Sequence, residues 1–425
     1  MKQIIKQALY QMRIQPLLSA VIVIGTAMAI CLVMVLMIVN QAKSAEYVPE
    51  VNRSRMLYVK YVRYLPDKTL KRASHSKLSL WLAKELFFKM ETPESVTATY
   101  RDGEVLLGVP GKGEEKNAEL LLTDANFWKV YEFNFIAGSA FSEAEHQSGI
   151  RKAVIVESVA RRLFGDVDEA IGKSMQINFA DYTVCGVVKD VHRFCELSFA
   201  EVYTSYNSNK AVSGTSSTQM QCTGGYVISI LARRSSDFET IRQEVDKNLR
   251  LVNDMLKDSE VQLMGQPDDF STQKSRKYSN QSSSMYVDIL KNIIGISIIL
   301  LVPAINLSGI TYTRMRWKQA ELGLRRAFGA TRKNLLWLVL NENLVLTVIG
   351  GFIGLLLSYF SIWLMDDWLL QDSKGNVASM NSAMISPMVF FIAFAFCLVL
   401  NLLSAYIPAR KVAHTPIVTS LNQKH

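Results

Sequence analysis

Four long stretches without an acidic or basic side chain constrain the fold of this chain more than any other feature. They cover residues 16–39, 292–313, 344–365 and 376–409, and contain 24, 22, 22 and 34 residues, with the most apolar part of the last at 384–407. A bilayer core about 30 Å thick is crossed by about 20 helical residues, so each stretch is long enough to span it. We therefore expect a membrane protein with four transmembrane α-helices.

The first stretch has an alternative interpretation as a cleavable signal peptide, because Lys2, Lys6 and Arg13 precede it. The apolar core of a signal peptide is about 7 to 15 residues long, and a cleavage site with small residues follows it. The stretch here is longer, and no such site follows cleanly. A retained membrane anchor is the better interpretation, and it makes the number of spans even.

The distribution of Lys and Arg predicts the orientation of the spans. Residues 1–15 carry three basic side chains and no acid, and residues 314–333 carry seven basic side chains against Glu321 alone. The loop between the third and fourth stretches has three Asp against Lys374. Because cytoplasmic loops are rich in Lys and Arg, both termini and the 314–333 loop are expected in the cytoplasm.

This orientation divides the chain into nine consecutive segments. We expect a cytoplasmic N-terminus at 1–15, spans at 16–39, 288–313, 334–365 and 384–408, a large outer domain at 40–287, a cytoplasmic loop at 314–333, a short outer loop at 366–383 and a cytoplasmic tail at 409–425.

The net charge of +9 follows from this topology and does not indicate nucleic-acid binding. Residues 40–291 carry 33 basic and 33 acidic side chains, so nearly all of the excess is cytoplasmic. No stretch interleaves aromatic residues with a basic cluster, as a nucleic-acid surface would. We expect no nucleic-acid partner.

The outer region has the pattern of an α+β domain. Short β-rich runs predict strands at 56–62, 153–156, 174–178, 182–188, 226–231 and 261–264. Apolar residues at helical spacing predict helices at 77–89, 157–164 and 238–252, the second of which ends at Gly165. The polar segment 206–225 is expected to be a loop, and the polar segment 271–284 leads into the second span.

Motifs for catalysis or metal binding are missing from the sequence. The segment "GDVDEAIGKS", residues 165–174, has six residues between its glycines where a phosphate-binding Walker loop has four. His75, His146 and His192 lie far apart in the chain, without an HExxH or CxxC motif, and are expected to be scattered surface residues. We expect no catalytic residue, no metal site and no cofactor.

The five cysteines say little about disulfide formation. Cys31 and Cys397 lie in predicted spans and are expected to pack as apolar residues. Cys185, Cys195 and Cys222 lie in the outer domain, and their odd number permits at most one disulfide. The sequence leaves open which pair forms, or whether any does.

A basic segment directly before the third span is the most informative part of the chain. Residues 321–328 predict a short amphipathic helix that lies along the inner membrane face and ends at Gly329. Thr331 can then cap the third span. An ordinary basic cytoplasmic loop is the alternative.

The sequence of this segment, "ELGLRRAFGA" at 321–330, resembles the loop between the second and third spans of FtsX/MacB-like permeases of ABC transporters. The resemblance continues in Glu342 with Gly350, Gly351 and Gly354, and in the C-terminal "PARKVAHTP" at 408–416. In the outer domain, the sequence from Val154 to Val191 is similar to a MacB-type periplasmic core.

This resemblance implies a coupling helix that is seated on a cytoplasmic ATPase. The residues carried over for that role are Glu321, Gly323, Arg325, Arg326, Gly329 and Ala330. It also implies a 1+3 arrangement of spans, and an outer domain with a base subdomain at 46–125 and 222–270, an inserted subdomain at 126–210 and a stalk at 271–287.

Two departures from relatives shape the expected assembly. Only fifteen residues precede the first span, so the ATPase is expected to be a separate polypeptide. The chain has a single three-span unit, so two permease chains are expected to pair as a homodimer or heterodimer. Gly350 and Gly354 have the spacing of a close helix contact, either at that interface or within one bundle, and Gly25 with Ala29 is a weaker candidate.

Glu342 is an acidic residue within the expected third span, at 334–365. An acid inside a bilayer costs a few kcal/mol, so its side chain should face protein or water. We expect a structural hydrogen bond to the second span, where Asn306 and Ser308 offer partners.

Together these features predict an inner-membrane permease that couples ATP hydrolysis in its partner to movement of a periplasmic domain, for efflux, lipoprotein release or regulation of a periplasmic protein. Its expected partners are the ATPase, a second permease chain, membrane lipid and a periplasmic or outer-membrane protein. The alternative function is a membrane-anchored receptor or scaffold whose outer domain binds a ligand or a cell-wall enzyme without ATP.

Overall fold

The computed structural model describes two compact units, one made of residues 1–45 and 289–425 and the other of residues 46–288. In the second unit, the outer unit, the described residues are Glu46, 48–67, 73–111, 115–213 and 222–276. In the first, the membrane unit, they are Tyr10, Arg13, Ile14, 16–44, 328–370 and scattered single positions in 290–325 and 388–410.

The strands of the outer unit form one connected sheet of fourteen strands within the described residues. The central path has the order β13-β2-β3-β12-β4-β5-β10-β7-β9-β6. The strands are β1 (Met56–Val59), β2 (Val62–Leu65), β3 (Ser74–Leu78), β4 (Ser95–Gly108), β5 (Lys116–Thr123), β6 (Phe135–Gly138), β7 (Lys152–Val156), β8 (Ser174–Ile177), β9 (Ala180–Val188), β10 (Val202–Ser205), β11 (Thr223–Gly224), β12 (Tyr226–Leu231), β13 (Glu260–Gln262) and β14 (Asp268–Asp269).

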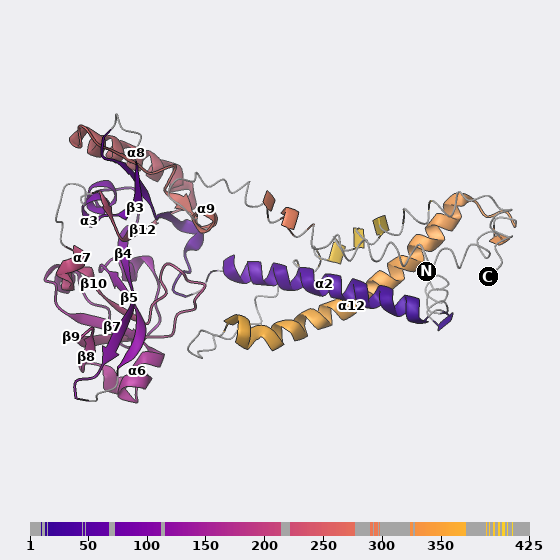
Figure 1. Ribbon diagram of the computed structural model, residues 1–425, viewed down its shortest axis with the longest axis horizontal. Coiled ribbons are helices and arrows are strands. Elements are labelled where there is room, and N and C mark those ends of the chain that lie inside the picture. The colour runs from indigo at the N-terminus through magenta and orange to yellow at the C-terminus, as the bar shows by residue number, and fades with distance from the viewer. Residues whose placement is uncertain are drawn as a thin grey trace. The chain divides into compact units, whose positions relative to one another are not determined.

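Helices and single helical turns connect these strands (Figure 1). They are α3 (Leu80–Ala83), α4 (Phe127–Val130), α5 (Glu143–Gln147), α6 (Glu157–Phe164), α7 (Lys210–Ser213), α8 (Phe238–Met255) and α9 (Phe270–Ser275), together with a π-helical turn at Lys84–Phe88 and 3₁₀ turns at Arg53–Arg55, Asp168–Ala170, Tyr206–Ser208 and Ser235–Asp237.

β12 lies inside this sheet, with neighbouring strands on both sides, and every one of its side chains is buried. It pairs antiparallel with β1 on one side and β4 on the other. A continuous run of β-branched and apolar residues is typical of a strand that is covered on both faces. The sequence "YVISIL" therefore specifies both the strand and its central place.

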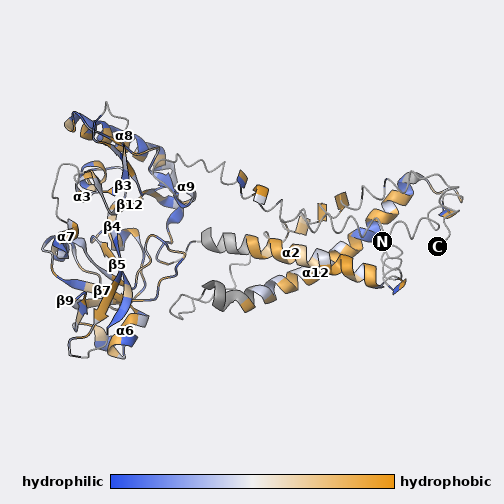
Figure 2. Ribbon diagram, viewed as in Figure 1, coloured by the Kyte–Doolittle hydropathy of each residue, from blue (hydrophilic) through white to orange (hydrophobic). Residues whose placement is uncertain are grey.

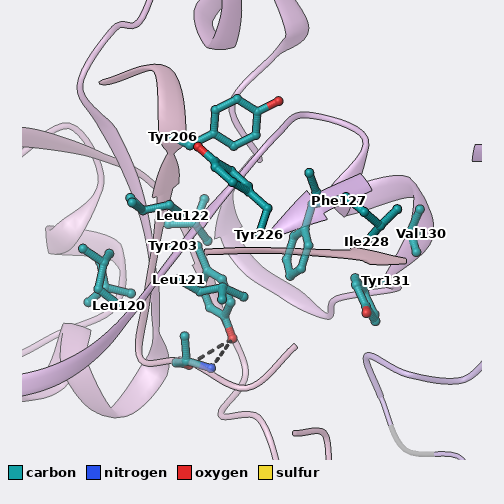
Figure 3. Packing of buried hydrophobic residues seen from close by; sticks show 14 of the residues in the cluster. Leu120, Leu121, Leu122, Phe127, Val130, Tyr131, Tyr203, Tyr206, Tyr226 and Ile228 are labelled. Carbon is teal, nitrogen blue, oxygen red and sulfur yellow. Dashed lines mark hydrogen bonds between the residues drawn. The ribbon is translucent and has the colours of Figure 1, made fainter. Parts of the chain in front are cut away.

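Aromatic side chains fill the core where α4 meets the sheet (Figure 3). The ring of Phe127 lies 4.8 Å from that of Tyr131 and 5.8 Å from that of Tyr203, measured between centroids. The hydroxyl of Tyr203 donates to the carbonyl of Ala200 at 2.9 Å and accepts from its N–H at 3.1 Å. A buried tyrosine is thereby satisfied at its polar end.

Several expected elements are present as predicted. The helix over 157–164 is α6 and ends at Gly165, whose φ is +90°. The strand over 226–231 is β12, and the strands expected near 174–178 and 182–188 are β8 and β9, which pair antiparallel. The helix expected over 238–252 is α8, three residues longer at its C-terminal end.

Two predicted elements are wrong in their extent. The strand expected over 56–62 is interrupted at Lys60 and Tyr61, because the N–H groups of both donate to Gln266 Oε1, at 2.8 and 3.2 Å. The helix expected over 77–89 starts only at Leu80, because Leu78 belongs to β3 and pairs with Thr223 and Tyr226. Ser79 caps the helix by accepting from the N–H of Leu82 at 3.1 Å.

Other corrections concern buried polar segments. The segment 206–225, expected to be a loop, contains a 3₁₀ turn, α7 and β11, and its first residue, Tyr206, is buried. His146, expected at the surface, is 5% exposed, and its Nδ1 lies 2.7 Å from the hydroxyl of Ser205. Burial of such a group is possible because the hydrogen bond replaces water.

The outer cysteines form no disulfide. Cys185 is half-buried, Cys195 and Cys222 are buried, and all three are free thiols. The pairing that the sequence left open therefore does not occur among them. Cys31 is also free, and Cys397 lies outside the described residues.

Two long helices, α2 (Pro16–Ser44) and α12 (Arg332–Leu370), lie side by side in the membrane unit (Figure 1). Most of their described residues are apolar (Figure 2). Within the described residues, these are the two helices long and apolar enough to cross a membrane, over Pro16–Leu36 and Lys333–Ser361. The expected spans at 288–313 and 384–408 lie mostly outside the described residues.

Candidate functional site: the segment before α12 and its contact with α2

The segment that precedes α12 contains a helical turn, and two backbone hydrogen bonds mark where this turn ends. The N–H of Phe328 donates to the carbonyl of Leu324 at 3.1 Å, and the N–H of Ala330 donates to the carbonyl of Arg325 at 3.0 Å. Gly329 lies between them with a φ of +95°. A six-to-one bond around a left-handed glycine is the Schellman helix end, which explains why glycine occupies this position.

α12 begins immediately after this helix end. Thr331 accepts a hydrogen bond from the N–H of Asn334 at 3.3 Å, so its side chain caps α12 at the first turn. The helix therefore starts two residues before the expected span at 334–365. The short connection leaves little slack between the preceding turn and α12.

The exposed side chains among the described residues of the segment are apolar. Phe328 is 83% exposed and Leu324 is 52% exposed, whereas Arg325 is half-buried. Glu321, Gly323 and Arg326, which the sequence singled out with them, lie outside the described residues. The described part offers a large aromatic side chain and an arginine, two residue types that are enriched at protein interfaces.

Gly350 and Gly354 bring α12 into backbone contact with α2 of the same chain. A Cβ atom at Gly350 would lie 2.9 Å from Thr26 Cβ and 3.0 Å from the carbonyl oxygen of Val23. One at Gly354 would lie 2.7 Å from the carbonyl oxygen of Ala27. Helices approach this closely only where side chains are absent.

Gly351 faces a different neighbour from its two companions. A Cβ atom there would clash with the ring of Phe394, in the region of the expected fourth span, and would lie 3.4 Å from Ile30 Cδ1. Three glycines at neighbouring positions thus contact two different parts of the membrane unit.

Polar side chains continue the glycine-lined face of α12 in both directions. Asn343 donates to the carbonyl of Val339 at 3.1 Å, and the hydroxyl of Thr347 donates to that of Asn343 at 2.8 Å. Ser358 is fully buried and donates to the carbonyl of Leu355 at 2.7 Å. Their spacing of three to four residues was a signal of this face that our sequence reasoning did not use.

Glu342 is half-buried and adjoins Asn343 in the sequence. The partners expected for it, Asn306 and Ser308, lie outside the described residues, so that hydrogen bond stays a prediction.

A buried ion pair holds the N-terminal segment of the outer unit, which follows α2 in the sequence, against the rest of that unit. Arg53 Nε donates to Glu50 Oε2 at 2.9 Å, with side chains that are 2% and 1% exposed. The guanidinium also donates to the carbonyl of Phe194 at 2.7 Å and lies 4.4 Å from the ring centroid of Phe270. The segment that follows the first span is therefore anchored to the loop around residue 194.

A second buried ion pair holds the C-terminal part of the described outer unit, near Arg276. Arg276 donates to both carboxylate oxygens of Asp268, and the two side chains are 1% and 3% exposed. It also donates to the carbonyl of Met264 at 3.3 Å. A bidentate guanidinium–carboxylate pair fixes orientation as well as distance.

Comparisons with known proteins identify the family of this chain. Residues 19–248 match the family model of the MacB-like periplasmic core domain, and residues 293–417 match that of the FtsX-like permease C-terminal region. The chain belongs to the FtsX/MacB-like permeases of ABC transporters. The family expected from the 321–330 segment is confirmed, and FtsX/MacB-like permeases are membrane proteins with an extracytoplasmic domain.

Curated relatives of this permease agree with that family. It is 26% identical to the uncharacterized ABC transporter permease YknZ of Bacillus subtilis, over 63% of this chain and 60% of YknZ. It is 27% identical to the pyoverdine export ATP-binding/permease protein PvdT of Pseudomonas fluorescens, over 71% of this chain and 42% of PvdT. The permease thus spans less than two thirds of the length of each of these relatives.

The solved extracellular domain of YknZ is similar to 48% of this chain and is itself covered to 99%, at 18% identity and a TM-score of 0.35.

Proposed function

We propose that this chain is the permease subunit that transmits movement from an ATP-hydrolysing cytoplasmic subunit to its own periplasmic domain. The observation that carries the proposal is the continuity between the Schellman helix end at Gly329 and α12. A partner that grips the segment before Gly329 would move α12 directly, because Thr331 already caps the first turn of that helix.

The glycine contacts extend this path to the first span. Gly350 and Gly354 hold the backbones of α12 and α2 together without flexible side chains between them. Packed interiors transmit displacement because they deform little. In the sequence, α2 ends at Ser44, and six residues later Glu50 of the outer unit forms its buried ion pair with Arg53.

The source of ATP hydrolysis is a separate subunit in this proposal. The sequence contains no GxxxxGK[ST] motif that would cradle nucleotide phosphates. The seven basic residues of 314–333 support a cytoplasmic location for this loop, and with it cytoplasmic termini and an outer unit in the periplasm. A pair of permease chains, as a homodimer or heterodimer, would contact a pair of ATPase subunits.

The test is co-purification with the ATPase. Full-length tagged permease is isolated from membranes of its own host, and ABC ATPase polypeptides are quantified by mass spectrometry. We expect Glu321→Lys combined with Arg325→Glu to reduce recovery of the ATPase at least tenfold, because the charges that face the partner are reversed. Lys411→Glu, which changes a basic residue in the tail, serves as the matched control and should recover the ATPase normally.

Unchanged recovery with the double variant would contradict the proposal. Such a result would favour a membrane-anchored receptor or scaffold that works without ATP. Membrane insertion is checked in parallel by the amount of each variant in the membrane fraction.

A further inference from the structure

A cavity of about 360 Å³ opens in the outer unit, away from the coupling segment. Its apolar lining comes from Leu121 on β5, Val227 on β12 and, from the loop that follows β9, Leu197 and Phe199. Cavities of this size and mixed lining hold small organic molecules.

Basic residues outnumber acidic ones around this cavity. The basic side chains are Lys60, Lys77, Arg101 and Arg193, and the acidic ones are Glu119 and Glu196. Arg101 is committed to the protein, because it donates to Glu119 Oε2 at 3.0 Å and to the carbonyls of Phe199 and Glu196 at 2.9 and 2.7 Å. The remaining charge of the lining is therefore positive.

Lys60 and Lys77 supply cations that the protein itself pairs weakly. Lys60 Nζ donates to the carbonyl of Gln273 at 3.3 Å, which is a neutral acceptor. The backbone of Lys77 pairs with Gly224 in the sheet, but within the part of the outer unit that the structure describes its ammonium makes no hydrogen bond or ion pair. Burying an ammonium without a counter-ion costs free energy, and an anion bound from solution would offset that cost.

The pKa values of both lysines reflect the same environment. Burial lowers the pKa of Lys60; the carboxylates of Glu196, Asp268 and Glu50 oppose this effect, and the charge of Lys77 adds to it. Burial also lowers the pKa of Lys77, assisted by the charge of Arg101. A bound anion would favour the charged form of each ammonium.

We propose that this cavity binds a small organic anion, with its carboxylate on Lys77 and Lys60 and its apolar part against Leu121, Val227 and Phe199. The size of the cavity, the apolar lining and the excess of positive charge all match such a ligand. A cationic molecule would be repelled by the two ammonium groups, and a neutral molecule would gain hydrogen bonds from them without the charge pairing.

The walls of this anion cavity are tied to the two segments through which the outer unit joins the spans. On one side, the loop that carries Arg193 and Phe199 is held by Arg53, through the carbonyl of Phe194 at 2.7 Å. On the other side, Lys60 and Tyr61 are held by Gln266 and Gln273 of the segment leading toward the second span. Occupancy would then be linked to the movement of the spans, a link that rests on the proposed function.

Binding itself is tested without the ATPase, so its outcome is independent of that function. The probe is 4-phenylbutyrate, an aryl carboxylate, added at millimolar concentration to the full-length chain in nanodiscs of zwitterionic lipid. Saturation-transfer NMR measures binding. We expect saturable binding that Lys77→Gln weakens at least tenfold, that Lys247→Gln leaves unchanged, and that neutral 4-phenylbutanol does not compete for.

A second measurement uses the unmodified chain and does not depend on the folding of a variant. Limited acetylation with an N-hydroxysuccinimide ester is followed by mass spectrometry, and 4-phenylbutyrate should slow acetylation of Lys60 and Lys77 several-fold but not that of Lys247. Absence of saturable binding, equal binding by Lys77→Gln, or equal protection of Lys247 would each overturn the anion cavity.

Discussion

The carboxylate of Glu50 accepts hydrogen bonds from both the N–H and the hydroxyl of Ser198, at 3.1 and 2.8 Å. Its other oxygen pairs with Arg53, so all of this polar cluster is buried and satisfied. Glu50 follows the end of α2 by six residues, whereas Ser198 lies in the loop that borders the anion cavity. The side chain of Glu50 therefore links the N-terminal segment of the outer unit to the loop that lines the cavity.

Removal of Arg53 should destabilise the outer unit strongly. Arg53→Met leaves the carboxylate of Glu50 buried without its cation, which typically costs about 3 to 5 kcal/mol. Urea unfolding of the full-length chain in detergent, followed by tryptophan fluorescence, measures the loss. The matched control is Arg161→Met, which breaks an exposed pair with Glu157 and should cost less than about 1 kcal/mol. Equal effects of the two substitutions would contradict the importance of the buried pair.

Enlargement of Gly350 should weaken the contact between α12 and α2. Gly350→Val places its Cβ 2.9 Å from Thr26 Cβ and its methyl groups against the α2 backbone, at a cost of roughly 1 to 3 kcal/mol for overpacking. The better helix propensity of valine offsets only about half a kcal/mol of that. Unfolding in mixed detergent micelles measures the balance. Gly295→Val, at a site where the described residues leave 4 Å free, should be neutral; a stable Gly350→Val would show that the helices can separate without loss.

Asp124 should make stability depend on pH. Its carboxylate accepts from the hydroxyl of Thr97 at 2.7 Å and from the N–H groups of Ala98 and Phe127, each at 2.9 Å. Burial nevertheless raises its pKa from 3.8 to about 6, outweighing these hydrogen bonds, which lower it. The folded state therefore binds the proton more tightly than the unfolded state, and the contribution of Asp124 to stability is present below pH 4 and lost as pH rises through 6.

The comparison with Asp124→Asn isolates this effect. The variant should be less stable at neutral pH, because its amide nitrogen cannot accept from the N–H of Ala98. Between pH 4 and pH 7, the free energy of unfolding of the wild type should fall relative to that of the variant by up to about 3 kcal/mol. Urea titrations at several pH values measure the difference. A difference that stays constant or grows with pH would refute the raised pKa.

The three outer cysteines should react slowly with alkylating reagents in the native protein. Burial raises the pKa of Cys195 to about 12 and those of Cys185 and Cys222 to about 11. The thiolate is the reactive form, so iodoacetamide at pH 8 should modify them on the order of a hundredfold more slowly than in denaturant. Peptide mass spectrometry measures each site. Prior reduction should change nothing, and any gain of labelled outer cysteines after reduction would reveal a disulfide.

Local patterns in the sequence predicted several helices and strands of the outer unit correctly. α6 was predictable because apolar residues recur at helical spacing and a glycine that can adopt positive φ ends the run. β12 was predictable because six consecutive β-rich residues have no polar interruption. The interruption of the first strand at Lys60 was not predictable, since it depends on Gln266, which is about 200 residues away in the chain.

The sequence by itself determined the apolar stretches, the asymmetry of basic loops, the family and the glycine-ended segment before α12, because these depend on composition and on neighbours within a few residues. Only the tertiary structure decided that Gly350 and Gly354 contact α2 within one chain, that Glu50 bonds Ser198, and that four cations surround one cavity. Those contacts depend on helix packing and strand register, which bring together residues more than 100 positions apart. The glycine spacing indicated a close helix contact, but the identity of each partner is not encoded in the neighbouring amino acids.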